Sequence, residues 1–570
     1  MKKDFMVLII EISMNGDKLK WWQKTVVYQI YPRSFRDTSG NGIGDLKGII
    51  EKLDYLNEDL GVETIWFSPF FESPQADHGY DVSDFRSIDP IYGSMKEFNE
   101  LLSKMHSKNM RIVLDLVLNH TSNKHLWFKE SASSKDNPKR DWYIWRDGKK
   151  PNGKKPPNNW KSMIGGSAWK YDEKTDQWYY FHFLPFQPDL NYRNPQVKEE
   201  MFKTMRFWLD KGVDGFRLDI LHSIFEDKQL RNDKLSWRLL PSDTHVDTLF
   251  HRHQYDLNLP ETFDFAMDLR SIMDEYKPER FLVGEAFGTI EELAKYYGPK
   301  NNGLHTVFLF EFTSTIPSFN PKKIRRIISR IEKALSPPFT PTYVYGNHDR
   351  DRYISLVNGD IQKAKLLATL QLTLRGIPFI YYGEEIGMSN VYFKLEESQD
   401  PIANKLSVFP ISFLARILGF SLTRDRCRTP MQWNTEPNAG FSVNGIIKPW
   451  LRIPDSYKLI NVEQEVGNPD SLFNTYRKLL KIRREKRSLS EGSFEFLNVN
   501  KLKNKYLAYR RFIDGDQVIV YLNFSKKAIM IDCPKQDKLL FSTLVNRIVL
   551  DSNNYKKKLR LNPLEGIILE

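Results

Sequence analysis

Short apolar runs alternate with amphipathic segments along most of the first 485 residues of the chain. Eight of these runs have the length of strands and lie between segments with a helical period. We therefore expect strands at Val26–Ile30, Glu63–Ser68, Arg111–Val117, Gly215–Ile220, Phe281–Glu285, Val307–Phe312, Tyr343–Tyr345 and Phe379–Tyr382.

The intervening segments place their apolar residues every three or four positions, which predicts amphipathic helices. The helices are expected over residues 46–60, 94–107, 195–211, 321–335 and 360–374. Regular alternation of strands and helices indicates a parallel sheet, and eight strands favour a closed (β/α)8 TIM barrel. A doubly wound open sheet is the alternative, but the first strand is not followed by a glycine-rich phosphate-binding turn.

Two long connections interrupt the expected barrel. Residues 120–189 are rich in Trp, Tyr, Asn, Pro and Lys, and they predict an inserted subdomain on the C-terminal face of the barrel. Residues 223–262 form a second long connection, after the fourth strand. The catalytic barrel is thus expected to span residues 17–119 and 190–485, after an N-terminal extension at residues 1–16.

The hydrophobic pattern changes after residue 485. The strand-like runs "YLAYRRF" and "QVIVYLNF" flank Asp514-Gly515, a dipeptide typical of tight hairpin turns. Residues 486–570 therefore predict a C-terminal antiparallel β domain, which we expect to be a β-sandwich.

Composition narrows the class of protein. The 570 residues are 41% hydrophobic and 27% charged, as in ordinary globular proteins. The net charge of +12 is spread along the chain without a base-reading motif, so we expect no nucleic-acid partner. Because the chain lacks an apolar run of about twenty residues, we expect no membrane partner. Two cysteines, Cys427 and Cys533, exclude a disulfide framework and favour a cytoplasmic location.

Charged and polar residues gather where the predicted strands end. Barrel enzymes place catalytic side chains at the C-terminal ends of several strands. A single acid there is usually a helix cap, but three acids flanked by histidine and arginine are hard to explain as caps. The candidates are His120, Arg217, Asp219, Glu285, His348 and Asp349.

Two chemistries use such a set of residues. Metal-dependent hydrolysis would need histidines at ligand spacing, and the "HRH" at residues 251–253 is expected to lie in a solvated loop instead. Glycoside hydrolysis needs one carboxylate that attacks the sugar and a second that donates a proton. Arg217 beside Asp219 would keep that carboxylate ionised, whereas Glu285 among other acids would be pushed towards protonation.

The chain resembles the α-amylase family of glycoside hydrolases (family 13) and, within that family, the α-glucosidase and oligo-1,6-glucosidase group. The motifs "DLVLNH", "QPDLN", "GFRLD", "GEA", "GNHD", "PFIYYGEEIGM" and "RTPMQW" occur in the family's order and cover nearly the whole chain. The resemblance implies a retaining exo-acting enzyme that removes terminal glucose from short oligosaccharides. It assigns Asp219 as the nucleophile, Glu285 as the general acid/base and Asp349 as the third acid, which holds sugar hydroxyls.

The resemblance also implies a blind substrate pocket. Asp77 in "QADHGYD" would bind the terminal glucose, Tyr80 would be a stacking platform, and Arg424 would close the pocket beside the 4-hydroxyl. The remaining residues that match the glucose-binding subsite are His120, Arg217 and His348.

The loop "DTSGNGIGD" at residues 37–45 is a candidate metal site. Oxygen-bearing side chains alternate along it, and its glycines allow a sharp turn, although a plain turn explains the pattern equally well. The resemblance implies a structural Ca²⁺ or Mg²⁺ and no cofactor for the chemistry itself. The ligands would be Asp37, Ser39, Asn41, Asp45 and the carbonyl of Ile43.

Substrate choice is left open. Ile220 follows the expected nucleophile, and its likeness to valine favours α-1,6 linkages, although isoleucine is an ordinary strand residue. His78 and the segment 389–420 depart from the family pattern. Glucosyl transfer or isomerisation, of the trehalose synthase or sucrose isomerase type, is the alternative activity. Non-catalytic relatives lose the catalytic acids, which this chain retains, and the sequence does not indicate an oligomeric state.

Overall fold

A computed structural model describes residues 19–238, 244, 247, 250–406, 423–497, 504–532, 538–545 and 558–570. Its centre is an eight-stranded sheet in the order β13-β12-β9-β5-β2-β1-β15-β14, in which all the pairs are parallel. The strands are β1 Val27–Ile30, β2 Thr64–Phe67, β5 Arg111–Leu116, β9 Gly215–Leu218, β12 Phe281–Gly284, β13 Thr306–Val307, β14 Thr342–Val344 and β15 Ile377–Tyr381.

A side chain bridges the seam between the two outermost strands of this sheet. The Thr342 hydroxyl donates to the carbonyl of Val307 at 2.9 Å and accepts from the amide of Leu309 at 3.2 Å. These two hydrogen bonds link β14 to β13, so the sheet closes into the predicted barrel. Edge groups that would otherwise stay unpaired are thereby satisfied.

The barrel interior is filled by its own apolar layer. Val27, Trp66, Val113, Val283, Phe308 and Phe379 form a cluster separate from the larger one between the sheet and the helices. At the N-terminal end, Trp22 of α2 (Trp21–Lys24) stacks on Phe281 with ring centroids 5.8 Å apart. Because this end is packed with hydrocarbon, polar groups inside the barrel lie towards the C-terminal end of the strands.

The helices that cover the sheet lie on the predicted amphipathic segments, except those that begin at Pro260 and Leu472, which were not predicted. They are α3 Leu46–Glu51, α4 Met95–Ser107, α6 Pro195–Asp210, α7 Pro260–Asp274, α10 Pro321–Ala334, α12 Ile361–Thr373 and α16 Leu472–Glu485. The short helices are α8 Ile290–Leu293, α9 Phe310–Thr313, α11 Tyr353–Leu356, α13 Pro401–Leu406, α15 Val462–Gly467 and α17 Arg487–Ser490. Helix starts follow the sequence, as when Ser94 and Glu97 form a capping box before α4.

Three expected elements differ from the structure. The helix expected over residues 46–60 is α3 followed by a π-helical segment, Tyr55–Leu60, which ends at Gly61 with φ 90°. The strand expected at Val307–Phe312 stops at Val307, and Phe310 begins α9. The strand expected to reach Ile220 ends at Leu218. Apolar content alone cannot distinguish a buried strand from a buried helical turn.

Small sheets occupy the long connections. Between β5 and α6 lie α5 (Leu126–Ser131) and a three-stranded sheet of β6 Trp145–Arg146, β8 Gln177–Tyr180 and β7 Trp169–Asp172. This subdomain has its own aromatic cluster around Trp160 and Trp169. Between β9 and α7 lies a two-stranded sheet, β10 Lys234–Leu235 with β11 His251–Arg252. Another such pair, β3 Phe71–Glu72 with β4 Asp84–Ile88, follows β2.

The C-terminal part contains two packed antiparallel sheets. One has the order β16-β17-β18-β22-β20, and β19 pairs with β21 in the other. Residues from both sheets, including Ile519 and Ile531, share one apolar cluster. The predicted hairpin turn is confirmed, because Asp514-Gly515 joins β17 to β18 and Gly515 has φ 76°. The bounds are β16 Ser493–Phe496, β17 Tyr506–Ile513, β18 Asp516–Asn523, β19 Ile529–Asp532, β20 Leu539–Ser542, β21 Lys558–Leu561 and β22 Gly566–Leu569.

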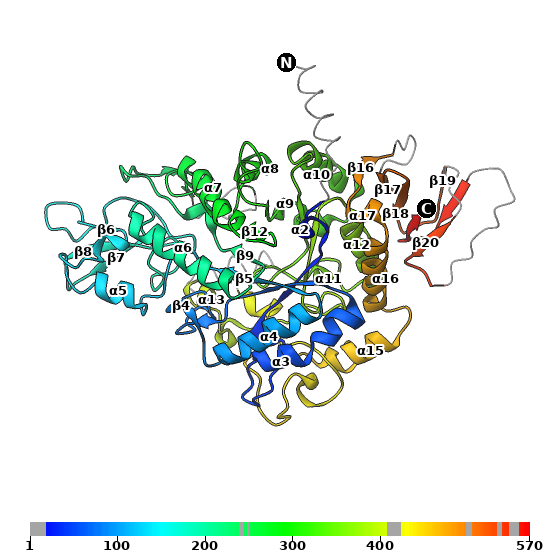
Figure 1. The fold of residues 1–570 in the computed structure, drawn as a ribbon, viewed down its shortest axis with the longest axis horizontal. Coiled ribbons are helices and arrows are strands. Elements are labelled where there is room, and N and C mark those ends of the chain that lie inside the picture. Colours follow the sequence, from blue (N-terminus) through cyan, green and yellow to red (C-terminus); the bar gives the residue numbers. More distant parts are fainter. Residues whose placement is uncertain are drawn as a thin grey trace, which may run out of the picture.

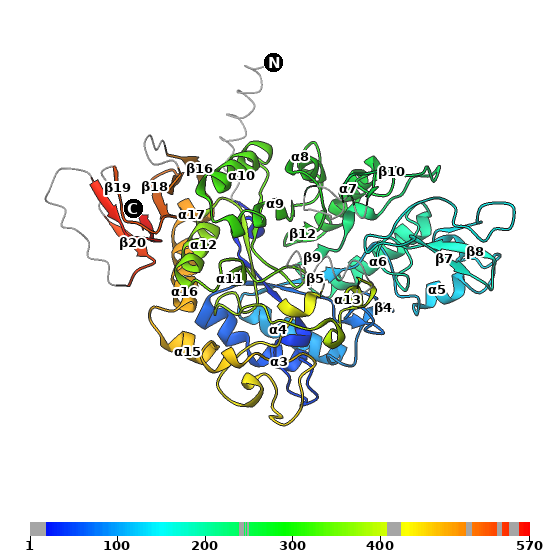
Figure 2. The same cartoon turned by 180° about the vertical axis from the view of Figure 1, so that it is seen from behind.

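The molecule is elongated. The inserted sheet β6-β8-β7 and the C-terminal sheets lie at opposite ends of the long axis, with the barrel between them (Figures 1 and 2). Within the described ranges, no helix has the length and apolar character needed to cross a membrane. Residues 1–18, Cys533 and residues 407–420 of the divergent segment 389–420 lie outside the described residues.

Candidate active site

Strand register brings the central charged residues together. In the parallel pairing of β5 with β9, Asp115 lies opposite Arg217, and in the pairing of β9 with β12, Val283 lies opposite Arg217. Side chains two residues further on share the same face, so Asp219 and Glu285 also point into the barrel just beyond the strand ends. One layer of the barrel therefore contains Asp115, Arg217, Asp219 and Glu285.

Arg217 is the cation at the centre of this layer, and it is fully buried. Its Nη1 donates to both carboxylate oxygens of Asp115, at 2.8 and 2.9 Å, and to Asp219 at 2.8 Å. Its Nη2 donates to Glu285. The guanidinium also faces the ring of Trp66, 5.1 Å from the centroid. A single positive charge thus serves three buried carboxylates, and only the bidentate geometry of arginine allows this.

The pKa values of Asp219 and Glu285 reflect the excess of buried carboxylates over positive charge. Burial raises the pKa of Asp219 to about 7, and Arg217 offsets this only in part because Asp115 and Asp349 add repulsion. Burial likewise raises the pKa of Glu285 to about 7. We expected Arg217 to keep Asp219 ionised, but the guanidinium is shared. At neutral pH the pair Asp219 and Glu285 therefore holds about one proton between them.

Asp349 has the opposite electrostatic environment. Its carboxylate accepts from Arg428 Nη2 at 2.7 Å and from Arg424 Nη1 at 3.1 Å, and His348 Nε2 lies 3.2 Å away. Burial alone would raise the pKa of Asp349, but His348 and the two arginines outweigh it and hold the pKa far below its usual range. Asp349 is therefore ionised at any working pH.

A second arginine closes one side of the site. Arg424 Nη2 donates to Asp77 at 2.7 Å and to Asp400 at 2.8 Å. Asp77 also accepts from Gln187 Nε2 at 3.1 Å, which ties it to the inserted subdomain. Asp400 is ionised, because Arg424 outweighs the effect of burial and lowers its pKa to about 2. With Asp349, three carboxylates from separate segments therefore converge on the guanidinium of Arg424.

The predicted aromatic and histidine residues form one wall. Tyr80 stacks on His348 with ring centroids 5.2 Å apart, and its hydroxyl lies 3.0 Å from Asp115 and 2.6 Å from His348 Nε2. His120 Nε2 lies 3.2 Å from the carbonyl of Tyr80, and burial lowers the pKa of His120 to about 3. Burial also lowers the pKa of His348, so hydrogen-bonding groups dominate this wall.

The residue that follows Asp219 is conformationally strained. Ile220 has φ 32° and ψ 44°, in the left-handed region that β-branched residues rarely adopt. Its carbonyl accepts from the amide of Ser223 at 3.2 Å, and a short 3-10 helix, Leu221–Ser223, follows. The turn moves the chain away from the strand direction immediately after Asp219.

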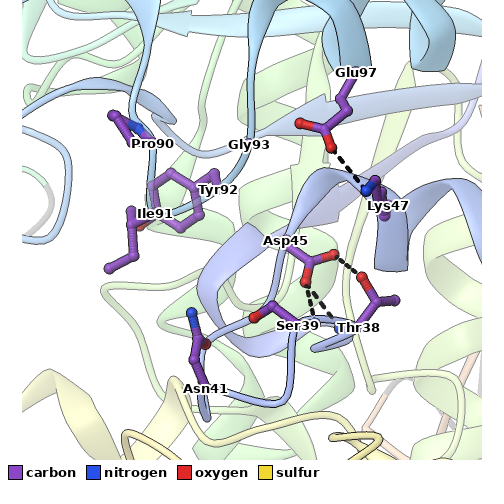
Figure 3. Close-up of a pocket in the computed structure, with 10 residues that line it drawn as sticks. All are labelled: Thr38, Ser39, Asn41, Asp45, Lys47, Pro90, Ile91, Tyr92, Gly93 and Glu97. Carbon is purple, nitrogen blue, oxygen red and sulfur yellow. Dashed lines mark hydrogen bonds and ion pairs between the residues drawn. The ribbon is translucent and has the colours of Figure 1, made fainter.

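The loop expected to bind a metal satisfies its own oxygen atoms. Asp37 accepts from Ser39, Gly40 and Gly42, and from Ser442. Asp45 accepts from Thr38, Ser39 and the amide of Gly48, and so caps the N-terminus of α3. Asn41 Oδ1 accepts from the amide of Ile43. Figure 3 shows the residues that line a cavity beside the loop, among them Lys47 and Glu97, which form an ion pair at 3.2 Å.

These hydrogen bonds make the loop a poor fit for a cation. A bound ion needs free lone pairs, whereas both carboxylates here already accept four hydrogen bonds each. The predicted Ca²⁺ or Mg²⁺ therefore stays a prediction, and we assign it no part in the chemistry.

We expect the chelator-treated protein to gain less than about 2 °C in Tm from millimolar Ca²⁺ or Mg²⁺, because ligands that bind weakly stabilise little. Differential scanning calorimetry measures this, with Asp45→Asn as the matched variant. A larger rise that disappears in Asp45→Asn would show that the loop is a metal site.

Some residues of the site were not anticipated from the sequence. Asp115 could have been found from strand register, since it lies opposite Arg217, but Asp400 has no motif that marks it. The prediction of a solvated loop for "HRH" is wrong, because His251 and His253 are 6% and 5% exposed. His253 pairs with Asp256 of the same connection and lies against His182 of the inserted subdomain, which is distant in sequence.

The chain is similar in sequence and in fold to known proteins. The catalytic domain of α-amylase matches residues 29–492. An oligo-1,6-glucosidase of Parageobacillus thermoglucosidasius is 38% identical, and the match covers 96% of this chain and 98% of that protein. The trehalulose synthase MutB of Pseudomonas mesoacidophila has a TM-score of 0.86 at 33% identity, covering 97% of this chain and all of the other.

A further solved structure, the α-glucosyl transfer enzyme XgtA, has a TM-score of 0.85 at 35% identity and covers 97% of this chain and 99% of that one. The length of the matches, the barrel topology and the order of the sequence motifs all indicate the same family. The chain therefore belongs to the α-amylase family of glycoside hydrolases.

Proposed function

We propose that the protein is a retaining, exo-acting α-glucosidase that removes terminal non-reducing glucose from short α-glucosides. The observation that carries the proposal is the pair Asp219 and Glu285, which bind the two ends of one guanidinium. The width of that fork limits their separation. Retaining glycosidases hold their two carboxyl groups about 5 Å apart, whereas inverting enzymes need roughly 6.5–9.5 Å to fit a water molecule.

In the first step, a carboxylate oxygen of Asp219 attacks the anomeric carbon while Glu285 gives its proton to the glycosidic oxygen. The bond from the anomeric carbon to that oxygen breaks, and the leaving group departs as an alcohol. In the second step, Glu285 takes a proton from water, the water oxygen attacks the anomeric carbon, and Asp219 is released.

Asp349 is the third acid in this proposal. Two arginines keep it ionised, so it accepts hydrogen bonds from sugar hydroxyls and stabilises positive charge at the anomeric carbon. Arg424 and Asp77 would bind the far end of the same glucose and block longer chains from extending past it. Cleavage would then proceed from the non-reducing end. We propose that no metal or other cofactor takes part in these steps.

Linkage preference is the finer part of the proposal. Ile220 favours α-1,6 bonds, in line with the oligo-1,6-glucosidases among the relatives. The second candidate is glucosyl transfer or isomerisation, favoured by the high structural similarity to a trehalulose synthase and to a glucosyl transfer enzyme. Both activities share the glucosyl-enzyme, and they differ in whether water or a sugar attacks it.

Product analysis on maltose, isomaltose, trehalose and sucrose separates these activities. We expect glucose from isomaltose at a higher kcat/KM than from maltose, and NMR before mutarotation should show the α anomer. A β anomer would contradict the retaining mechanism. Isomerised disaccharides as the main products from sucrose would favour the second candidate.

Substitutions at the two acids should have different effects. Asp219→Ala should lower kcat by at least about 10⁴-fold on every substrate, because no nucleophile remains. Glu285→Gln should lower it strongly on isomaltose but much less for the first step on dinitrophenyl glucoside, whose leaving group needs no proton. Stopped-flow bursts measure that step. Equal losses of Glu285→Gln on both substrates would contradict the acid role.

The pH dependence of kcat/KM should be a narrow bell centred near pH 7. Activity requires Asp219 to be ionised, so the rate falls as the pH drops through the pKa of Asp219. Activity also requires Glu285 to be protonated, so the rate falls again as the pH rises through the pKa of Glu285. In Glu285→Gln, assayed on dinitrophenyl glucoside, the alkaline limb should disappear and the acid limb should remain. Persistence of both limbs would contradict this assignment.

A further inference from the structure

A buried cluster of histidines and aspartates lies beside the active site and has no role in the proposed reaction. It consists of Asp233, His253 and Asp256 from the connection between β9 and α7, and of His182 from the inserted subdomain. Asp256 is fully buried, and the other three are between 1% and 5% exposed. We call these four residues the His253 cluster.

Several buried polar atoms of the His253 cluster have no hydrogen-bond partner among the described residues. His253 Nδ1 lies 2.9 Å from Asp256 Oδ2, and His182 Nδ1 lies 3.7 Å from the same oxygen. Four further atoms make no hydrogen bond among the described residues, namely Asp233 Oδ2, Asp256 Oδ1, His182 Nε2 and His253 Nε2. A buried polar atom without a partner is destabilising, so such a concentration of them indicates a ligand.

The charges of the cluster are also unbalanced. Among the described residues, the ion-pair partners of Asp256 are His182 and His253, and we find no lysine or arginine paired with either aspartate. The cations nearest to these two buried carboxylates are therefore imidazoles, and a divalent cation would offset the negative charge more fully.

We propose that Asp233, His253 and Asp256 bind a divalent transition-metal ion, with His182 positioned as a fourth ligand. One donor atom from each of the first three residues can be chosen so that all lie within 4.8 Å of one another. A tetrahedral zinc ion holds its ligand atoms roughly 3.4 Å apart, so small side-chain rotations would complete the site. Imidazole nitrogen combined with carboxylate oxygen favours zinc over calcium or magnesium.

The ion would be structural and would join two segments that are distant in sequence. His182 follows β8 of the inserted subdomain, and its amide donates to Asp189, which forms a β-bridge with His120 in the active site. His253 and Asp256 follow β11 in the connection after Asp219. A metal between these segments would fix the connection against the subdomain on the side of the barrel where the leaving group would lie.

The test uses the full-length protein, stripped with a chelator, dialysed and then equilibrated with zinc alone. Mass spectrometry of bound metal should find one zinc more per chain in the wild type than in Asp233→Asn or His253→Gln. Zinc should also raise the Tm of the wild type by at least about 3 °C and leave the Tm of both variants unchanged. His251→Gln, two residues from His253 on β11, is the matched control and should keep the zinc.

Two results would overturn the proposal. One is equal zinc content in the wild type and in both variants, which would place any bound zinc elsewhere. The other is a wild type whose Tm does not respond to zinc, a measurement that does not depend on whether the variants fold. Calcium added in place of zinc should give no shift, which separates this site from the loop at residues 37–45.

Discussion

The site depends on one buried guanidinium. Arg217 is the only cation in contact with Asp115, Asp219 and Glu285 among the described residues, and hydrocarbon fills the barrel below it. Removing one partner of a buried ion pair costs roughly 3–5 kcal/mol, and here three partners would be left at once. Strand register must therefore be correct before the charges can be buried, so fold and chemistry constrain each other.

The rest of the site is assembled around this layer by segments outside the barrel strands. Arg424 and Arg428 surround Asp349 with positive charge, whereas the acids around Arg217 have too little of it. Carboxylates only a few ångströms apart thus have very different proton affinities. The difference in pKa arises because loops outside the barrel supply additional cations to Asp349. The barrel strands themselves need no change to produce it.

Much of this arrangement could be predicted from the sequence, for physical reasons that differ between residues. Asp219 and Glu285 follow buried strands whose period places them on the inner face, so their meeting follows from the barrel. Asp400 could not be found in this way, because its contact with Arg424 joins two irregular segments. His253 was placed in solvent for the same reason, since its neighbour His182 comes from a loop-rich insertion whose position no local pattern indicates.

The backbone at Ile220 has a consequence for how the protein could be improved. A β-branched residue in the left-handed region costs about 1–3 kcal/mol, and glycine would release most of that cost. Selection for heat resistance alone would therefore favour a change beside the nucleophile, at the position where a looser backbone would aim Asp219 less accurately. Stability and turnover compete at this single turn, so an engineered variant that gains one is expected to lose part of the other.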